Sequence, residues 1–220
     1  MLGQIKHIAL IPDGARRWAR RENVTLRESY RKMMDLLALD TQALFEAGAN
    51  VISLYLLSKE NLRRPPEELN AALIEEKRFV EILVPQLCTQ LKVNARIAGT
   101  PELLPEPWNA IVLPPQQVPA DFNKKLNLCI AYSPDAELSF ALKRIQGTTN
   151  TSSIISHLWV DESVDLLIRT GGAQTLSNFI PLQCGYARLM FVNELFNDTS
   201  VETVVRIVRE HLKQDFKFGW

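Results

Sequence analysis

Short apolar runs alternate with longer amphipathic segments along most of this chain. The apolar runs, which predict strands, are residues 5–11, 51–57, 94–98, 126–132, 164–168 and 189–192. Apolar spacing and end signals predict helices over 31–47, 65–91 with a kink at Pro85, 136–145 and 203–212. Strands that alternate with helices form a mainly parallel sheet with both faces covered. We therefore predict an α/β fold with a central, mostly parallel six-stranded sheet flanked by helices.

The size and composition of the chain fit a single domain over residues 1–220. A formal net charge of zero argues against broad nucleic-acid binding, which usually needs a basic patch. The three cysteines lie far apart without CxxC spacing, which is typical of reduced thiols. The N-terminal stretch MLGQIK is too short and too polar to be a signal peptide. No apolar run in the chain approaches the roughly 20 residues that are needed to cross a bilayer. We expect a soluble cytoplasmic protein without stable membrane insertion.

The first apolar run ends at Pro12 and is followed by a carboxylate, a glycine and two arginines: Asp13, Gly14, Arg16 and Arg17. Ligands of open α/β sheets bind where strands end in this way. The amides of a following helix favour an anion, and arginines bind phosphate through paired donors. A carboxylate among cations can share Mg²⁺ with a phosphate. The segment predicts a diphosphate–Mg²⁺ site, although the arginines also fit the solvated face of an ordinary helix.

Two further strand ends carry polar groups. The second strand is followed by Ser58, Glu60, Asn61 and Arg64, and the fifth by Arg169, Thr170, Gly171, Gly172, Ser177 and Asn178. Strand ends of a parallel sheet share one edge, so these groups should converge. Arg169 directly follows an apolar strand, where burial requires an anionic partner. Residues 170–172 offer backbone amides, while Ser177 and Asn178 also fit the simpler role of helix caps.

Five segments in order carry a family resemblance: HIALIPDGARRWA (7–19), SLYLLSKENLRRP (53–65), LNLCIAYS (126–133), DLLIRTGGAQTLSNF (165–179) and FKFG (216–219). Together they resemble the cis-prenyltransferases, the undecaprenyl diphosphate synthase family, over almost the whole chain. The resemblance implies a homodimeric α/β enzyme that acts on allylic diphosphates, with Mg²⁺ held by Asp13. It also implies that the tail at Phe218-Gly219 reaches the site of the partner subunit.

The same resemblance assigns roles to individual residues. The implied catalytic residues are Asp13, Ser58, Glu60 and Asn61, of which the asparagine is implicated in proton removal. The implied diphosphate- or substrate-binding residues are Gly14, Ala15, Arg16, Arg17, Trp18, Tyr30, Arg64, Arg169, Thr175, Ser177 and Arg188. Within this set the resemblance places the allylic diphosphate on Arg17 and the amides of residues 14–16. It places the diphosphate of the acceptor on Arg169 and Ser177.

The chain also departs from the family pattern. The usual DGNGRW reads DGARRW at 13–18, and a histidine is replaced by Tyr30. An arginine of the third motif is replaced by Thr175, and the glutamate after Tyr-Ala, which reaches across the dimer as a metal ligand, by Arg188. The resemblance therefore implies a rewritten acceptor site.

This pattern of departures is similar to the cyclolavandulyl diphosphate synthase branch of the family. We expect an enzyme that couples two dimethylallyl diphosphates head to middle and closes a ring in the ten-carbon product. One alternative is a short-chain elongating enzyme that uses isopentenyl diphosphate. Another is a catalytically silent subunit that supports an active partner. Bulky side chains at Met33, Met34, Phe79 and Leu83 would keep a product short if they lined the pocket, although ordinary helix core is the favoured interpretation.

Overall fold

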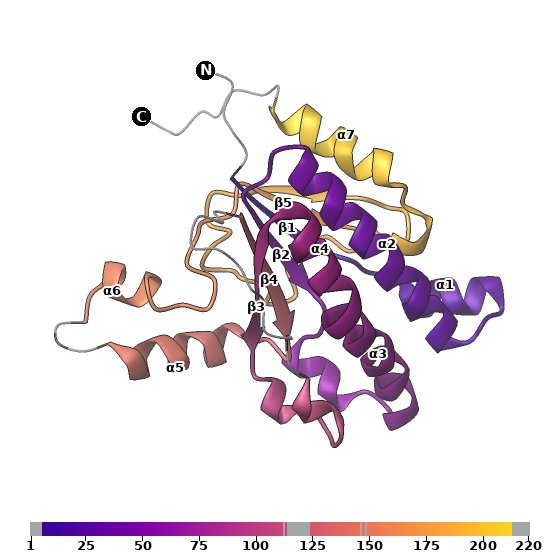
Figure 1. Ribbon diagram of the computed structural model, residues 1–220, viewed down its shortest axis with the longest axis horizontal. Helices are drawn as coiled ribbons and strands as arrows, with labels where there is room; N and C mark the ends of the chain where they lie inside the picture. The colour runs from indigo at the N-terminus through magenta and orange to yellow at the C-terminus, as the bar shows by residue number, and fades with distance from the viewer. Residues whose placement is uncertain (1–5, 112, 114–123, 146, 148, 213–220) are drawn as a thin grey trace.

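A six-stranded sheet forms the centre of the computed structural model, which describes residues 6–111, 113, 124–145, 147 and 149–212 (Figure 1). The strands are β1 (His7–Ile11), β2 (Val51–Tyr55), β3 (Val93–Gly99), β4 (Lys124–Ile130), β5 (Leu166–Arg169) and β6 (Arg188–Phe191). Their order is β3-β4-β2-β1-β5-β6, and each neighbouring pair is parallel. The predicted α/β fold is confirmed, with a sheet that is parallel throughout.

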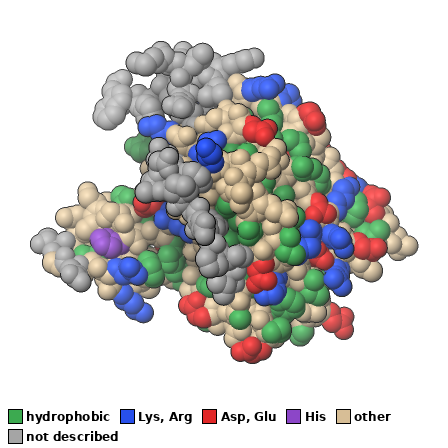
Figure 2. Space-filling view, viewed as in Figure 1, with side chains coloured by type: hydrophobic (Ala, Val, Ile, Leu, Met, Phe, Trp, Pro, Cys, Tyr) green, Lys and Arg blue, Asp and Glu red, His purple; other side chains and the backbone are tan. Residues whose placement is uncertain are grey.

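Helices flank this sheet. They are α1 (Ala15–Glu22), α2 (Leu26–Glu46), α3 (Pro66–Arg78), α4 (Val84–Leu91), α5 (Pro134–Arg144), α6 (Thr151–Ile155) and α7 (Val201–Leu212). Residues of α2, α3, α4 and α7 share one apolar core with β1, β2, β4 and β5. The opposite face packs mainly against residues 159–187, while α5 and α6 project from the body (Figure 1). Acidic and basic side chains are interspersed over the helical face (Figure 2), which agrees with the zero net charge.

Two helices differ from the prediction for local reasons. Helix α2 begins five residues earlier than expected, at Leu26, because Thr25 and Glu28 form a reciprocal capping box. The predicted helix over 65–91 is divided into α3 and α4 by a π-helical turn at Phe79–Leu83. Pro85 lies in the first turn of α4, where its missing N–H is tolerated. The short helix α6 was not predicted from the sequence.

The register of the sheet brings three loops to one edge. Ile11 of β1 lies beside Arg169 of β5, and β2 ends next to them at Tyr55. The loops that begin at Pro12, Leu56 and Thr170 therefore leave the sheet at the same place. Among the described residues, no helix is long and apolar enough to cross a membrane. The predicted role of Phe218-Gly219 falls outside these residues.

Candidate active site

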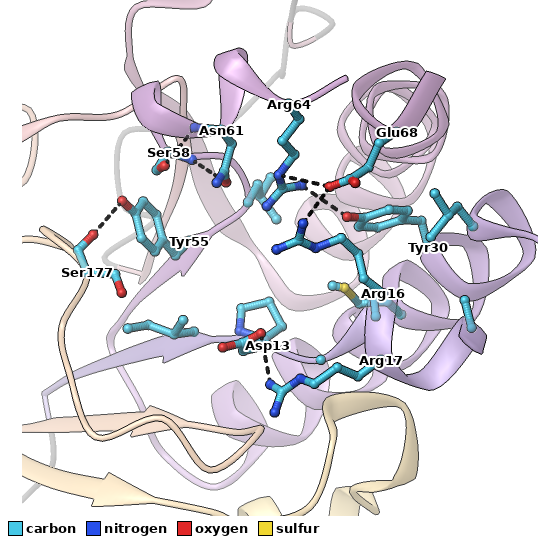
Figure 3. A pocket seen from close by; sticks show the side chains of 18 of the residues that line it. Asp13, Arg16, Arg17, Tyr30, Tyr55, Ser58, Asn61, Arg64, Glu68 and Ser177 are labelled. Atoms are coloured by element: carbon cyan, nitrogen blue, oxygen red, sulfur yellow. Dashed lines mark hydrogen bonds and ion pairs between the residues drawn. The ribbon is translucent and has the colours of Figure 1, made fainter. Parts of the chain in front are cut away.

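A cavity of about 710 Å³ opens at this edge of the sheet (Figure 3). Its polar lining includes Asp13, Arg16, Arg17, Arg20, Tyr30, Tyr55, Ser58, Asn61, Arg64, Glu68, Arg169 and Ser177. Its apolar lining includes Ile11, Ala19, Val24, Leu26, Met33 and Leu56. The three loops that were predicted to converge therefore do so around one space.

The carboxylate of Asp13 joins two arginines at one side of the cavity. Its Oδ1 lies 3.3 Å from Nη2 of Arg17, and its Oδ2 accepts a hydrogen bond of 3.0 Å from Nη2 of Arg169. Asp13 is the anionic partner that the burial of Arg169 required. Two contacts with Thr170 fix the backbone here, since the Asp13 N–H donates to Oγ1 and that hydroxyl donates to the Asp13 carbonyl.

The amino end of α1 points its first amides toward this side of the cavity. The residue before the helix is Gly14, with φ of 121°, and no side chain caps the helix. A Cβ at Gly14 would lie 2.9 Å from Cδ2 of Leu195, so the turn requires glycine. Uncapped amides and the helix dipole make this end of α1 a favourable place for a diphosphate.

The loop after β5 organises Arg169 instead of offering its own amides. The N–H groups of Gly171 and Gly172 donate to the carbonyls of Glu194 and Val192, at 2.7 and 2.9 Å. The prediction that residues 170–172 present amides to a ligand is therefore wrong. Nη1 of Arg169 donates to the carbonyl of Thr175 at 2.6 Å and to Oγ of Ser177 at 2.7 Å.

A second group of charges lies across the cavity, between α1 and α3 (Figure 3). Nη1 of Arg16 donates to Oε1 of Glu68 at 2.8 Å, and Nε of Arg64 lies 3.6 Å from the same oxygen. Nη1 of Arg64 also donates to the hydroxyl of Tyr30 at 3.0 Å. Burial raises the pKa of the Tyr30 phenol, so this hydroxyl is neutral near pH 7.

Ser58 and Asn61 hold each other at the start of a 3₁₀ turn, Lys59–Arg63. The Ser58 N–H donates to Oδ1 of Asn61, and the Asn61 N–H donates to Oγ of Ser58, both at 3.2 Å. Oδ1 of Asn61 is thus already an acceptor within the turn. Nearby, the hydroxyl of Tyr55 donates to the carbonyl of Ser177 at 2.9 Å and ties this loop to the one after β5.

Comparison with known proteins assigns the chain that forms this cavity to a family. The model described as putative undecaprenyl diphosphate synthase matches residues 11–219. The chain belongs to this family and is a prenyltransferase. An isoprenyl transferase of Enterococcus faecalis is 28% identical, with 99% of this chain and 86% of the relative covered. An isoprenyl transferase of Bifidobacterium longum is 30% identical, with 97% and 86% covered.

Two solved structures share the fold of this prenyltransferase. A lavandulyl diphosphate synthase from Lavandula x intermedia, solved with dimethylallyl diphosphate, matches with a TM-score of 0.87 at 22% identity, over 99% of both chains. A probable undecaprenyl diphosphate synthase from Campylobacter jejuni matches with a TM-score of 0.78 at 25% identity, over 99% of this chain and 100% of that one. The predicted cis-prenyltransferase fold is confirmed.

Four predicted site residues do not line the cavity of the prenyltransferase. Glu60 is exposed and accepts a hydrogen bond of 3.5 Å from Nδ2 of Asn178. Trp18 faces the other side of α1, where its Nε1 donates to Asp198 and its ring lies under Lys32.

The other two are Thr175 and Arg188. Thr175 contacts two lining residues, Arg169 and Ser177, but does not line the cavity itself. Arg188 pairs with Leu166 at the amino end of β6, whereas Asp13 lies beyond the carboxyl ends of the strands. Arg188 therefore cannot serve the acceptor site of its own chain.

Some lining residues were missed in the sequence. Glu68 stands four residues after Arg64, a spacing that predicts a helical ion pair but not its place in the cavity. Tyr55 lies inside an apolar strand and gave no separate signal. Of the four bulky side chains considered above, Met33 lines the cavity, while Met34 and Phe79 are fully buried core and Leu83 packs against it.

The donor set suits Mg²⁺ at Asp13. Its side chain is 33% exposed at the cavity, next to the uncapped amides of α1. Mg²⁺ commonly takes one or two carboxylate ligands and completes its shell with water and phosphate oxygens. Among the described residues there is no cluster of three or more side chains that would hold a metal alone. Asp13 thus fits a metal that is shared with a diphosphate.

Proposed function

We propose that this prenyltransferase condenses two molecules of dimethylallyl diphosphate, head to middle, into a branched ten-carbon diphosphate that is then closed into a ring. The observation that carries the proposal is the short apolar wall of the cavity. It is made by Leu26 and Met33 of α2 with Ala19 and Val24 beside them. Behind it, Met34 and Phe79 are fully buried in the apolar core. Such a wall suits two five-carbon groups.

The donor diphosphate belongs at the amino end of α1. There Arg17 and the first amides of the helix would bind its oxygens, and Asp13 would hold Mg²⁺ against them. Bound Mg²⁺ would neutralise the charge that grows on the diphosphate. When the C1–O bond breaks, the electron pair leaves with the diphosphate and an allylic cation remains. Arg17 and the helix amides would stabilise this charge separation, because residues 14–17 line the cavity where the leaving group is proposed to bind.

The double bond of the second molecule then attacks the cation. Its C2 forms the new bond to C1 of the donor, which leaves a tertiary cation at its C3. A methyl group on that C3 then loses a proton, which leaves a terminal double bond. Return of a proton to C2 of the donor half makes a tertiary cation at its C3, and the terminal methylene attacks this cation to close a six-membered ring. Loss of a further proton gives the product, so each cycle releases one diphosphate and, in balance, one proton. Of the proton acceptors expected from the sequence, Asn61 and Ser58 line the cavity, whereas Glu60 is exposed and does not; released diphosphate is the remaining candidate.

A second candidate function is short-chain elongation with isopentenyl diphosphate. It is favoured by one observation: Asn61, Arg64, Arg169 and Ser177 all line the same cavity. The two functions differ in the acceptor alone, since donor ionisation is the same in both.

Product analysis separates these functions. Purified enzyme is incubated with Mg²⁺ and dimethylallyl diphosphate alone, and then with isopentenyl diphosphate added. The proposal expects a branched or cyclic ten-carbon product in the first mixture. Product that forms only with isopentenyl diphosphate would establish elongation instead. Absence of product in both mixtures, with binding to another family member, would identify a supporting subunit.

A further inference from the structure

The loop after β5 contains a short stretch of strained backbone. Ser177, Asn178 and Ile180 have φ of 48°, 61° and 35°, in the left-handed region that favours glycine. Asparagine tolerates this region, but a β-branched residue such as Ile180 rarely adopts it. Residues in this conformation persist only where the surrounding structure fixes them, and they cluster at functional sites. The shape of residues 177–180 must therefore be imposed by their neighbours.

The strained stretch forms part of the cavity wall. Ser177 lines the cavity, and its Oγ accepts a hydrogen bond of 2.7 Å from Nη1 of Arg169. These are the two residues on which the family resemblance places the diphosphate of the acceptor. Rotation of Ser177 about its N–Cα bond, toward negative φ, would move both its carbonyl and its side chain, because both are attached to Cα. The position of the Ser177 hydroxyl therefore depends on the strained backbone.

Two aromatic side chains hold this backbone against the end of the sheet. The ring of Phe179 is fully buried and stacks on Tyr55, the last residue of β2, with 4.4 Å between the centroids and 13° between the planes. The hydroxyl of Tyr55 donates to the carbonyl of Ser177 at 2.9 Å (Figure 3). Burial raises the pKa of the Tyr55 phenol, so the hydroxyl keeps the proton that it donates. The stack anchors the chain at residue 179, and the hydrogen bond fixes the peptide at residue 177.

We propose that Tyr55 is a positioning residue for the acceptor substrate, and that it acts by holding Ser177 and Arg169 in the shape that receives the acceptor diphosphate. This inference rests on the proposed function and names what shapes its second substrate site. Phe179 supports the same shape through the stack. Since Tyr55 leaves the sheet edge from β2, it joins the frame of the fold directly to the strained loop.

Calorimetric titration with dimethylallyl thiolodiphosphate and Mg²⁺ tests this role, because sulfur in place of the bridging oxygen slows ionisation. We expect two molecules to bind per chain of the wild-type enzyme. Arg17→Ala identifies the donor event, since Arg17 belongs to the proposed donor site. Tyr55→Phe keeps the stack but removes the hydroxyl, so the other event should weaken by about threefold to tenfold, the range for one lost hydrogen bond. The donor event should change by less than about twofold, because it lies elsewhere in the cavity.

Tyr132→Phe is the matched control. Tyr132 is fully buried in the same aromatic cluster, and its ring lies edge-on to those of Tyr55 and Phe179. Its hydroxyl donates to Glu137 and not to the loop after β5. Both variants should lower the midpoint of thermal unfolding, whereas only Tyr55→Phe should weaken the acceptor event. Tyr55→Leu, which also removes the stack, should weaken that event further.

An acceptor event that is unchanged in Tyr55→Phe, or weakened equally in Tyr132→Phe, would overturn the role of Tyr55. Equal weakening of both events in Tyr55→Phe would do the same, because it would show a general loss of structure. One bound molecule per wild-type chain would also overturn it, since the loop would then have no acceptor to receive.

Failure of this role and failure of the proposed function give different results. If dimethylallyl diphosphate alone yields product while Tyr55→Phe keeps its acceptor event, the function stands and the role of Tyr55 is wrong. If the wild type requires isopentenyl diphosphate while Tyr55→Phe still loses affinity in the acceptor event alone, the role stands with another acceptor.

Discussion

At the residue scale, Asp13 forms ion pairs with both Arg17 and Arg169. In the proposed function its carboxylate would also hold a metal that is shared with the donor diphosphate. Its backbone is fixed by Thr170 on both the N–H and the carbonyl side. One residue thus joins the end of β1 to the loop after β5, and a change there should affect folding and catalysis separately.

Asp13→Asn tests the catalytic task. The amide keeps the size of the side chain and an oxygen that accepts from Arg169, but it loses the charge that binds Mg²⁺. We expect kcat to fall by about a hundredfold or more, the usual scale for loss of a group that stabilises a leaving charge. Thermal unfolding and steady-state kinetics would be measured on the same preparation. Near-normal turnover would remove Asp13 from the mechanism.

At the scale of elements, the geometry of the proposed donor site depends on the close approach of the loop after β5 to α1. Gly171 has φ of 82°, and a Cβ there would lie 2.5 Å from Nη2 of Arg17 and 3.0 Å from the carbonyl oxygen of Asp13. The carbonyl of Gly171 also accepts a hydrogen bond of 2.7 Å from Nη1 of Arg17. The position of Arg17 therefore depends on the absence of a side chain at 171.

Gly171→Ala and Gly172→Ala form a matched pair for this contact. Both glycines have φ near 80°, so alanine costs about 1–2 kcal/mol of backbone strain at either position. At Gly172 the nearest atoms would lie 3.8 Å away, which is ordinary contact. We expect donor affinity to fall about tenfold more in Gly171→Ala, because only this change displaces Arg17. Equal affinities in the two variants, measured by calorimetry, would contradict this account.

For the secondary-structure elements, much of the arrangement could be predicted from the sequence. Strand positions, parallel pairing and convergence of the three loops follow from apolar runs and the groups at their ends, and the structure confirms them. The start of α2 at Leu26 was missed although its signal is local, because Thr25 and Glu28 have the spacing of a capping box. The π turn before Pro85 gave no such signal. The sequence also could not show that the amides of Gly171 and Gly172 donate to the carbonyls of residues 194 and 192, because those partners lie about 20 residues away.

The site itself was less predictable than the fold. Motif order placed Asp13, Asn61, Arg64 and Arg169 around one space, which the structure bears out. It also included Trp18, whose side chain contacts Asp198 and Lys32 instead. The role of Arg188, which the family pattern places across the dimer, stays a prediction, since Arg188 lies at the amino end of β6. Glu68 was missed because an acid four residues from an arginine is common on helix surfaces.

At the scale of the whole molecule, the main feature is an apolar arm formed by α5 and α6. Helices α5 and α6 project from the body (Figure 1), and Leu138, Leu142 and Ile155 on them are 36%, 48% and 47% exposed. Leu138 and Leu142 stand one helical turn apart on the same side of α5. Clustered exposed apolar side chains mark interaction surfaces. We expect this arm to contribute to the homodimer that the family resemblance implies.

Sedimentation measures the dimer directly. The wild type should sediment with about twice the chain mass of 25.0 kDa. Leu142→Glu should shift it toward the monomer, since a charge in an apolar interface loses its hydration. Leu39→Glu is the control, because Leu39 is 53% exposed on α2, away from the arm. A Leu142→Glu variant that stays dimeric would exclude α5 from the interface.

The central claim is that the new bond joins C1 of one dimethylallyl unit to C2 of another. It is tested most directly by incubating the enzyme with an equal mixture of [1-¹³C]- and [2-¹³C]dimethylallyl diphosphate and recording the ¹³C spectrum of the product. The account predicts a one-bond ¹³C–¹³C coupling, because only head-to-middle condensation places a labelled C1 beside a labelled C2 from a different molecule. A ten-carbon product without that coupling, or product only when isopentenyl diphosphate is present, would contradict it.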